Sequence, residues 1–391
     1  MSFFARLNDE IEKWHNEKAY RPLTVISSAQ SSRVSIGGRE VVQLSSNNYL
    51  GLTSHPRLKK AAAVATAKWG VGTGSVRTIA GNLALHKAYE QRLAAFKETE
   101  AALTFQSGFT ANLAVLTSLL TKDDAVFSDE LNHASIIDGI RLTKAKRYIY
   151  KHSDMKALEE ALADSTESDG RLIVTDGVFS MDGDIALLPE IVKLAKKYKA
   201  TVMVDDAHAS GVLGRNGRGS VDYFSLHGQV PIQVGTLSKA IGVVGGYVAG
   251  PKVLIDYLSQ RARPFLFSTS QPPGVIAACD AALDVLLQEP QLIDQLWKNT
   301  NFFKSGLKNL GFNIGPGQTP ITPIMLEEDS LAMQFSDLLL GAGVYAQGIY
   351  FPTVPKGRAR IRTIVTALHS KEDLAFCLHV FERTGQALGI I

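Results

Sequence analysis

The sequence predicts an α/β fold with a mostly parallel central sheet flanked by helices, followed by a smaller α/β domain at the C-terminus. Two observations lead to this prediction. Between about residues 100 and 250 one theme repeats, a short apolar strand, a polar or glycine-rich turn and a helical stretch, which is typical of βαβ units. From about residue 286 the pattern of helices and strands changes, which indicates a second, smaller unit.

The strands of the repeated region are short apolar runs that end in polar residues. The last three begin about 30 residues apart, the spacing of one strand, one turn and one helix. Ligands of such sheets bind beyond the carboxyl ends of the strands, so chemistry is expected there. The predicted strands cover residues 102–105, 124–127, 172–175, 202–205 and 232–235, and one of the helices between them covers 189–198.

We expect three parts along the chain. Residues 1–46 form an N-terminal arm, residues 47–285 a large domain, and residues 286–391 a small C-terminal domain. The arm begins with an amphipathic helix, because apolar side chains recur at helical spacing, and continues with a short strand pair. The elements predicted outside the large domain are helices over 3–18, 290–310, 331–341 and from 371, and strands near 34, 41–44, 321–326, 344 and 360.

Composition restricts the function classes. The chain has 391 residues and a formal net charge of +3, without the basic excess of a nucleic-acid-binding protein. Its two cysteines, Cys279 and Cys377, are too few and too far apart for a disulfide framework or a cysteine-based zinc site. No run approaches the roughly 18 apolar residues of a membrane-spanning helix, and residues 1–10 lack a signal-peptide pattern. We expect a cytoplasmic enzyme with no metal, nucleic-acid or membrane partner.

An acid and a lysine at the ends of two predicted strands indicate a pyridoxal phosphate site. Asp205 and His208 stand at the carboxyl end of one strand. A helix cap and a surface acid would explain a carboxylate at this place equally well. Lys239 follows the next strand among small residues, although most lysines lie on the surface. Together the two meet the needs of pyridoxal phosphate, an amine for the Schiff base and a carboxylate for the protonated pyridine nitrogen.

The turn after the first strand is the predicted phosphate site. Ser107, Gly108 and Phe109 open a helix there, and free backbone N–H groups at a helix start bind phosphate well. In isolation an ordinary strand-to-helix turn is the simpler interpretation. Thr236 offers a hydroxyl group near Lys239 as a second phosphate ligand.

Two further strand ends offer groups for the cofactor ring. His133 can lie flat on the pyridine ring, although a histidine at a helix start is more often a capping or surface residue. Ser180 can donate a hydrogen bond to the ring hydroxyl oxygen. No dinucleotide fingerprint, P-loop or H-E-x-x-H zinc motif occurs in the sequence.

In this order the motifs resemble the α-oxoamine synthase family. These are fold-type I pyridoxal-phosphate-dependent transferases that join an acyl-CoA to an amino acid. The resemblance covers nearly the whole chain; each block is modest alone, but their number and order argue against a chance match. The blocks are 46–52 (SNNYLGL), 107–109 (SGF), 132–139 (NHASIIDG), 175–183 (TDGVFSMDG), 204–208 (VDDAH), 236–240 (TLSKA), 267–270 (FSTS) and 352–357 (PTVPKG).

The resemblance implies roles for the residues around the cofactor ring. Lys239 would be the Schiff-base lysine and the base that moves protons. Asp205 would pair with the pyridine nitrogen, and His133 would stack on the ring. Ser180 and His208 would contact the ring hydroxyl.

The resemblance also implies a phosphate site that two subunits share. The residues at 107–109 and Thr236 would bind the phosphate from one subunit. Thr269 would reach it from the other subunit, so that a homodimer would be needed to complete the active site.

One arginine is expected to bind the amino-acid substrate. Arg362 matches the family arginine that holds the substrate carboxylate, for which a guanidinium fork is well suited. Asn47 matches an asparagine assigned to the same substrate. We expect the neighbouring Arg360 to be a solvated strand residue outside the site.

Within the family, the chain is most similar to glycine C-acetyltransferase, also called 2-amino-3-ketobutyrate CoA ligase, which joins acetyl-CoA to glycine. This similarity rests on residues 28–30, 75–77, 144–148 and 362–363. Ser238 departs from that pattern. The alternative is 8-amino-7-oxononanoate synthase of the biotin pathway, which joins a pimeloyl thioester to L-alanine and releases CO₂, or a promiscuous α-oxoamine synthase. An aminotransferase would use the same lysine and acid without a CoA site. A non-catalytic homologue would lack Lys239.

Overall fold

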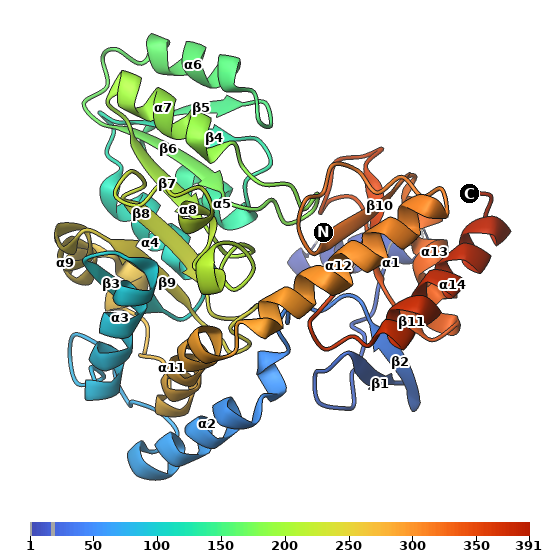
Figure 1. The fold of residues 1–391 in the computed structure, drawn as a ribbon. Coiled ribbons are helices and arrows are strands. Elements are labelled where there is room, and N and C mark those ends of the chain that lie inside the picture. Colours follow the sequence, from blue (N-terminus) through green and yellow to red (C-terminus); the bar gives the residue numbers. More distant parts are fainter. Residues whose placement is uncertain (1, 17–19) are drawn as a thin grey trace.

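The computed structural model describes residues 2–16 and 20–391 and is built around a seven-stranded sheet (Figure 1). The strand order is β3-β9-β8-β7-β6-β4-β5. Of these seven strands, only β9 runs antiparallel to its two neighbours, β3 and β8. The mostly parallel α/β class is therefore confirmed. The strands are β3 (Ala101–Phe105), β4 (Ala125–Asp129), β5 (Lys146–Tyr150), β6 (Arg171–Asp176), β7 (Thr201–Asp205), β8 (Ile232–Thr236) and β9 (Gly246–Gly250).

Helices cover both faces of this sheet, and their side chains close two separate cores. On β7, Met203 packs into one core, whereas Val202 and Val204 pack into the other. Successive strand residues point to opposite faces, so strands covered on both sides are apolar throughout. One face is covered by α4 (Gly108–Leu119), α5 (Ala134–Arg141), α9 (Lys252–Arg261) and α10 (Arg263–Leu266), and the other by α6 (Met155–Asp164) and α7 (Leu188–Tyr198).

A third core lies beside the β3 edge of the sheet. It is formed by α2 (Pro56–Trp69), α3 (Ala84–Lys97) and α11 (Pro273–Gln288). At the contact between α2 and α11, Gly274 has to be a glycine, because a Cβ atom there would lie 2.5 Å from the Thr66 hydroxyl oxygen. Short turns of helix, η1 (Leu52–Ser54), η2 (Arg215–Gly217) and α8 (Ser220–Tyr223), complete this part.

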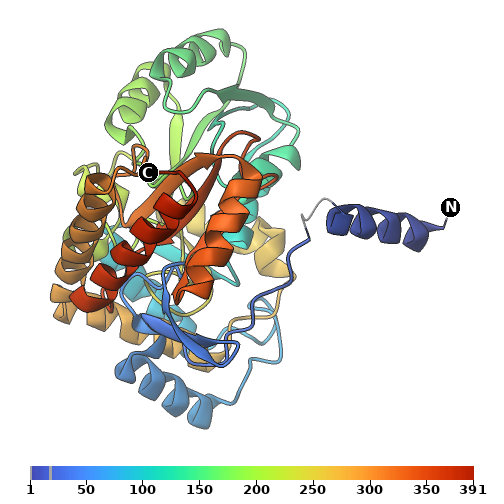
Figure 2. The same ribbon diagram turned by 90° about the vertical axis from the view of Figure 1, so that its right-hand side faces the viewer.

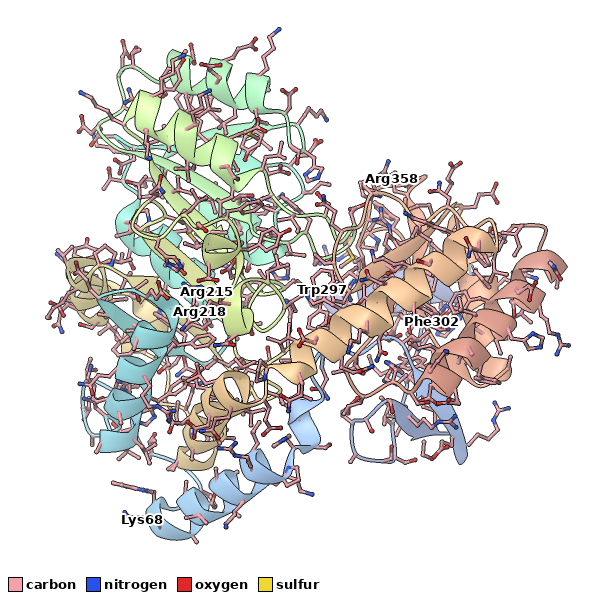
Figure 3. All side chains as sticks on the ribbon, in the orientation of Figure 1. Lys68, Arg215, Arg218, Trp297, Phe302 and Arg358 are labelled. Atoms are coloured by element: carbon pink, nitrogen blue, oxygen red, sulfur yellow. The ribbon has the colours of Figure 1, made fainter. Side chains whose placement is uncertain are left out.

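The C-terminal part has its own sheet and core, in agreement with the predicted change of pattern. Phe303, Phe335 and Phe381 meet at its centre and are fully buried. Trp297 lies on the helix that leads into this part, and its indole N–H donates to the Val212 carbonyl oxygen over 3.1 Å (Figure 3). The elements are α12 (Gln291–Asn309), β10 (Ile321–Glu327), α13 (Asp329–Gly341), β11 (Val344–Tyr345), β12 (Gln347–Ile349), β13 (Ala359–Ile364) and α14 (Lys371–Ala387).

The N-terminal segment joins the C-terminal part. Helix α1 (Phe3–Asn16) follows the predicted helix except for residues 17 and 18, which lie outside the described residues. It extends away from the rest of the chain and buries none of its residues (Figure 2). Strands β1 (Arg33–Ile36) and β2 (Arg39–Gln43) form a sheet with β11. The division into three domains stays a prediction.

The predicted strands and helices outside the arm are confirmed to within a few residues. In the part of the chain that the structure describes, no helix combines the length and apolar character needed to cross a membrane.

Candidate active site

A pocket opens at the carboxyl ends of the central strands, where the parallel arrangement predicts it. It brings together nine of the predicted site residues with Asn112, Ser135, Asp176, Val178, Ala207 and Ser238. The nine are Ser107, Gly108, Phe109, His133, Ser180, Asp205, His208, Thr236 and Lys239.

Lys239 lies in the turn after β8 with its amine in the pocket. Burial lowers the pKa of Lys239 to about 8. The negative charges of Asp205 and Asp176 act in the opposite direction, and the positive charge of Arg362 adds to the lowering. A far larger fraction of this amine is neutral near pH 8 than of an ordinary lysine, and a neutral amine is the form that attacks an aldehyde.

Asp205, the last residue of β7, is held by two donors. Its Oδ1 accepts a hydrogen bond from the Ala207 amide at 2.8 Å, and its Oδ2 accepts one from the Asn112 side chain at 2.6 Å. The same Asn112 amide group donates to the Ser135 hydroxyl at 2.9 Å. A carboxylate has about four lone-pair sites, so Asp205 can still accept a bond from a cationic N–H.

His133 caps helix α5 and also lines the pocket, and its place on the face of the cofactor ring stays a prediction. Its Nδ1 accepts from the Ser135 amide at 3.3 Å and lies 2.7 Å from the Ser135 hydroxyl. Its own backbone N–H donates to Asp176 at 3.1 Å. Burial lowers the pKa of His133, which favours the neutral ring.

Asp176, the last residue of β6, is the second acid of the pocket. Burial and the neighbouring Asp205 raise its pKa well above the ordinary value of a carboxyl group. The two acids differ in their hydrogen bonds, since Asp205 accepts from the Asn112 side chain and the Ala207 amide, whereas Asp176 accepts from the His133 amide.

The start of helix α4 leaves backbone N–H groups free for an anion. Ser107 caps it by accepting from the Thr110 amide at 3.1 Å. The amides of Gly108 and Phe109 come too early in the helix to find an intrahelical acceptor, and such groups bind phosphate. Thr236 lies close by, since a Cβ atom on Gly108 would come 3.2 Å from its Cβ.

Arg362 lies beside the pocket rather than in its lining. From β13 its Nε donates to the Ser180 carbonyl oxygen at 2.6 Å, and its Nη2 donates to Asn47 Oδ1 at 3.3 Å. Burial lowers the pKa of Arg362, and both of these bonds go to neutral oxygens. A buried guanidinium with neutral partners is well suited to a carboxylate that arrives with the substrate.

Arg360 and Thr269 lie elsewhere than expected or outside the pocket lining. Arg360 is not solvated: it is 2% exposed and donates to Asp182 Oδ1 at 2.7 Å and to the Met181 carbonyl oxygen at 2.9 Å. It lies two residues from Arg362 on the same face of β13, so both guanidiniums meet the loop around Ser180–Asp182. Thr269 is exposed and does not line the pocket, and its predicted contact across a dimer stays a prediction.

Three further residues of this region had no predicted role. Asn112 stands one helical turn after Gly108, and its position on the same face of α4 was the available signal. Asp176 ends an apolar strand, as Asp205 does. Tyr49 lies in the block 46–52 that carries the resemblance, but its contact with His208 Nδ1, at 2.7 Å, could not be foreseen because the two are 159 positions apart in the sequence.

The residues present fit pyridoxal phosphate. Lys239 supplies an amine with a lowered pKa, Asp205 a positioned carboxylate, and the α4 start an anion site. The carbonyl oxygen of the Asn112 side chain is buried without a partner among the described residues, as expected of a polar cavity built for a ligand.

The amine of Lys239 is expected to titrate near pH 8 in the protein freed of cofactor. Competitive acetylation with acetic anhydride at graded pH, followed by mass spectrometry of the Lys239 peptide, measures this. Asp205→Asn should move the midpoint to lower pH, because the lost negative charge favoured the ammonium form. Asp138→Asn, at an exposed carboxylate, is the control and should not move it. A midpoint near 10.5, or one that Asp205→Asn leaves in place, would contradict this electrostatic description.

Comparison with known proteins extends the argument from the pocket to the whole chain. Residues 39–380 match the family model described as aminotransferase class I and II. The 8-amino-7-oxononanoate synthase of Exiguobacterium sibiricum is 60% identical over 388 residues, 99% of this chain and 100% of the relative. The Bacillus subtilis protein named 8-amino-7-oxononanoate synthase 1 is 58% identical over 99% of both chains.

Solved structures agree with this grouping. Serine palmitoyltransferase from S. paucimobilis, with PLP and myriocin bound, has a TM-score of 0.95 at 32% identity and covers 100% of both chains. The 8-amino-7-oxononanoate synthase of Francisella tularensis has a TM-score of 0.77 at 29% identity, over 90% of this chain and 99% of that one. The fold is the expected fold-type I pyridoxal-phosphate-dependent transferase fold. The chain therefore belongs to the class I and II aminotransferase family and, within it, to the pyridoxal-phosphate-dependent α-oxoamine synthases.

Proposed function

We propose that the chain is an 8-amino-7-oxononanoate synthase, which joins a pimeloyl thioester to L-alanine and releases CO₂ and the free thiol. The observation that carries this proposal is that relatives 57–60% identical over 98–100% of the chain bear this name. They support the alternative of the sequence analysis, not its main expectation, glycine C-acetyltransferase. The two activities share every site residue named above, and the short segments used to choose between them lie outside this pocket.

The pocket can perform the first half of the reaction. Pyridoxal phosphate, when bound, supplies an electron-withdrawing ring that makes the Cα–H bond of an attached amino acid acidic. Lys239 would hold the cofactor through its amine and would serve as the base that takes the Cα proton of the amino acid. Its pKa of about 8 suits this exchange, since a base is most effective when its pKa is near the working pH.

Asp205 and His133 support the ring in this proposal. Asp205 would pair with the protonated pyridine nitrogen, and the Asn112 and Ala207 donors hold its carboxylate in place. The neutral His133 offers a flat face that brings no second positive charge close to Lys239.

Arg362 positions the amino acid by its carboxylate. Its bonds to the Ser180 carbonyl oxygen and to Asn47 fix the plane of the guanidinium. A planar fork held at one edge grips a carboxylate in one orientation, which sets the direction of the Cα–H bond relative to Lys239.

We further propose that the active enzyme is a homodimer with shared active sites. Thr269 is paired through an isolated bridge with Val76. Large apolar side chains on these two segments are exposed, Val71 at 83%, Ile79 at 82% and Phe267 at 70%. Clustered exposed apolar groups are typical of a protein interface. The cytoplasmic location stays a prediction.

A substrate matrix tests the proposed activity. Glycine, L-alanine and L-serine are each combined with acetyl-CoA and with pimeloyl-CoA, and product masses, free thiol and CO₂ are measured. L-alanine with pimeloyl-CoA should give the highest kcat/KM and equal amounts of CO₂ and thiol. Faster turnover of glycine with acetyl-CoA would overturn the proposal in favour of glycine C-acetyltransferase. Amino-group exchange without thiol release would indicate an aminotransferase.

Arg362→Ala should raise the KM for the amino acid by roughly tenfold to a hundredfold, the value of a charged hydrogen bond to a carboxylate, with a smaller effect on the KM for the thioester. Arg358→Ala removes an exposed arginine at the start of the same segment (Figure 3) and is the control. An unchanged amino-acid KM in Arg362→Ala would mean that another group holds the carboxylate.

A further inference from the structure

One contact of the pocket has no role in the chemistry above, the hydrogen bond between Tyr49 and His208. The Tyr49 hydroxyl oxygen lies 2.7 Å from His208 Nδ1. The two rings meet edge to face, with centroids 6.1 Å apart and an interplanar angle of 82°. Tyr49 is 1% exposed and His208 is 6% exposed. His208 lines the pocket, whereas Tyr49 does not.

The groups around the Tyr49 hydroxyl show whether Tyr49 or His208 donates in this hydrogen bond. A buried hydroxyl pays a large free-energy penalty when its proton has no acceptor. Among residues 2–16 and 20–391, Nδ1 of His208 is the one hydrogen-bond partner of the Tyr49 hydroxyl. Arg362, whose charge acts on this phenol, has only donors and cannot take its proton. The hydroxyl therefore donates, and Nδ1 accepts.

The protonation states agree with this direction. Burial raises the pKa of Tyr49, so the phenol keeps its proton. Burial, with the positive charges of Lys239 and Arg362, lowers the pKa of His208 well below its ordinary value, so the imidazole is neutral. A neutral imidazole that accepts at Nδ1 carries its proton on Nε2.

We propose that Tyr49 is a positioning residue that fixes the tautomer of His208, so that an Nε2–H donor is presented to the pocket. A hydrogen-bond donor at this place suits an anionic or carbonyl oxygen of the ligand. Without Tyr49, the ring could instead protonate Nδ1 and present an acceptor.

The fold holds Tyr49 firmly enough for this task. The Tyr49 carbonyl oxygen accepts from the Ala367 amide at 2.7 Å. Gly51, with φ of 73°, turns the chain directly afterwards, and a Cβ atom there would overlap Leu368. The segment 47–49 thus supplies both Asn47 to Arg362 and Tyr49 to His208.

The test is ¹⁵N NMR of the holoenzyme labelled at histidine. The chain has nine histidines, and the signals missing from His208→Phe assign residue 208. Wild type should show His208 with Nδ1 unprotonated and Nε2 protonated. Tyr49→Phe should lose this single state. A wild-type His208 protonated at Nδ1, or signals that Tyr49→Phe leaves in place, would overturn the proposal. Should Tyr49→Phe fail to fold, a wild-type His208 protonated at Nδ1 would still overturn the proposal.

Two further variants separate positioning from mere packing. Tyr247→Phe removes another buried phenol hydroxyl, one that bonds Ser210 at 2.7 Å, and should leave the His208 signals unchanged. Tyr49→Phe should lower kcat/KM roughly tenfold, the value of one hydrogen bond, but less than about twofold in a His208→Phe background. An equal loss in both backgrounds would overturn the proposal.

The choice of substrates for these rates rests on the proposed function, whereas the NMR result does not. A wrong substrate assignment would therefore appear as low turnover with the expected spectrum.

Discussion

The burial of Lys239 beside Asp205 at one edge of a parallel sheet is the constraint on which the rest of the site depends. Asp205 on β7 pairs in register with Val234 on β8, so the sheet itself sets the separation of acid and lysine. Burial costs the ammonium form stability and lowers the pKa of Lys239 to about 8. The other titratable groups of the pocket lie around this pair. The pKa of Asp176 is raised, which favours its neutral form, and the lowered pKa values of His133 and His208 favour neutral rings.

The C-terminal part contacts the loop Ser180–Asp182 at the edge of the pocket. Residues Ser180–Asp182 accept from Arg362 and Arg360 with carbonyl and carboxylate oxygens. Arg360 already has a carboxylate partner in Asp182, whereas Arg362 has only neutral partners among these contacts. The two arginines of β13 therefore have different roles, because Arg360 pairs with a carboxylate and Arg362 with neutral oxygens.

Much of the site could be predicted because it follows from topology. Strand ends of a parallel sheet meet at one edge, so Asp205, Lys239, His133 and Ser180 could be brought together from sequence order alone. Tyr49 could not, since its contact with His208 depends on how a distant segment packs. Arg360 was assigned to solvent because alternation along a strand gives the face but not what covers it. The acyl donor and amino acid could not be chosen, as the alternatives share all these residues.

The most direct test of this account is to find which lysine holds pyridoxal phosphate. The holoenzyme is reduced with borohydride, which makes the bond between cofactor and protein permanent, and is then digested and analysed by mass spectrometry. The account predicts the phosphopyridoxyl group on the peptide that contains Lys239, in an amount near one per chain. A label on another lysine, or no stable label, would contradict it.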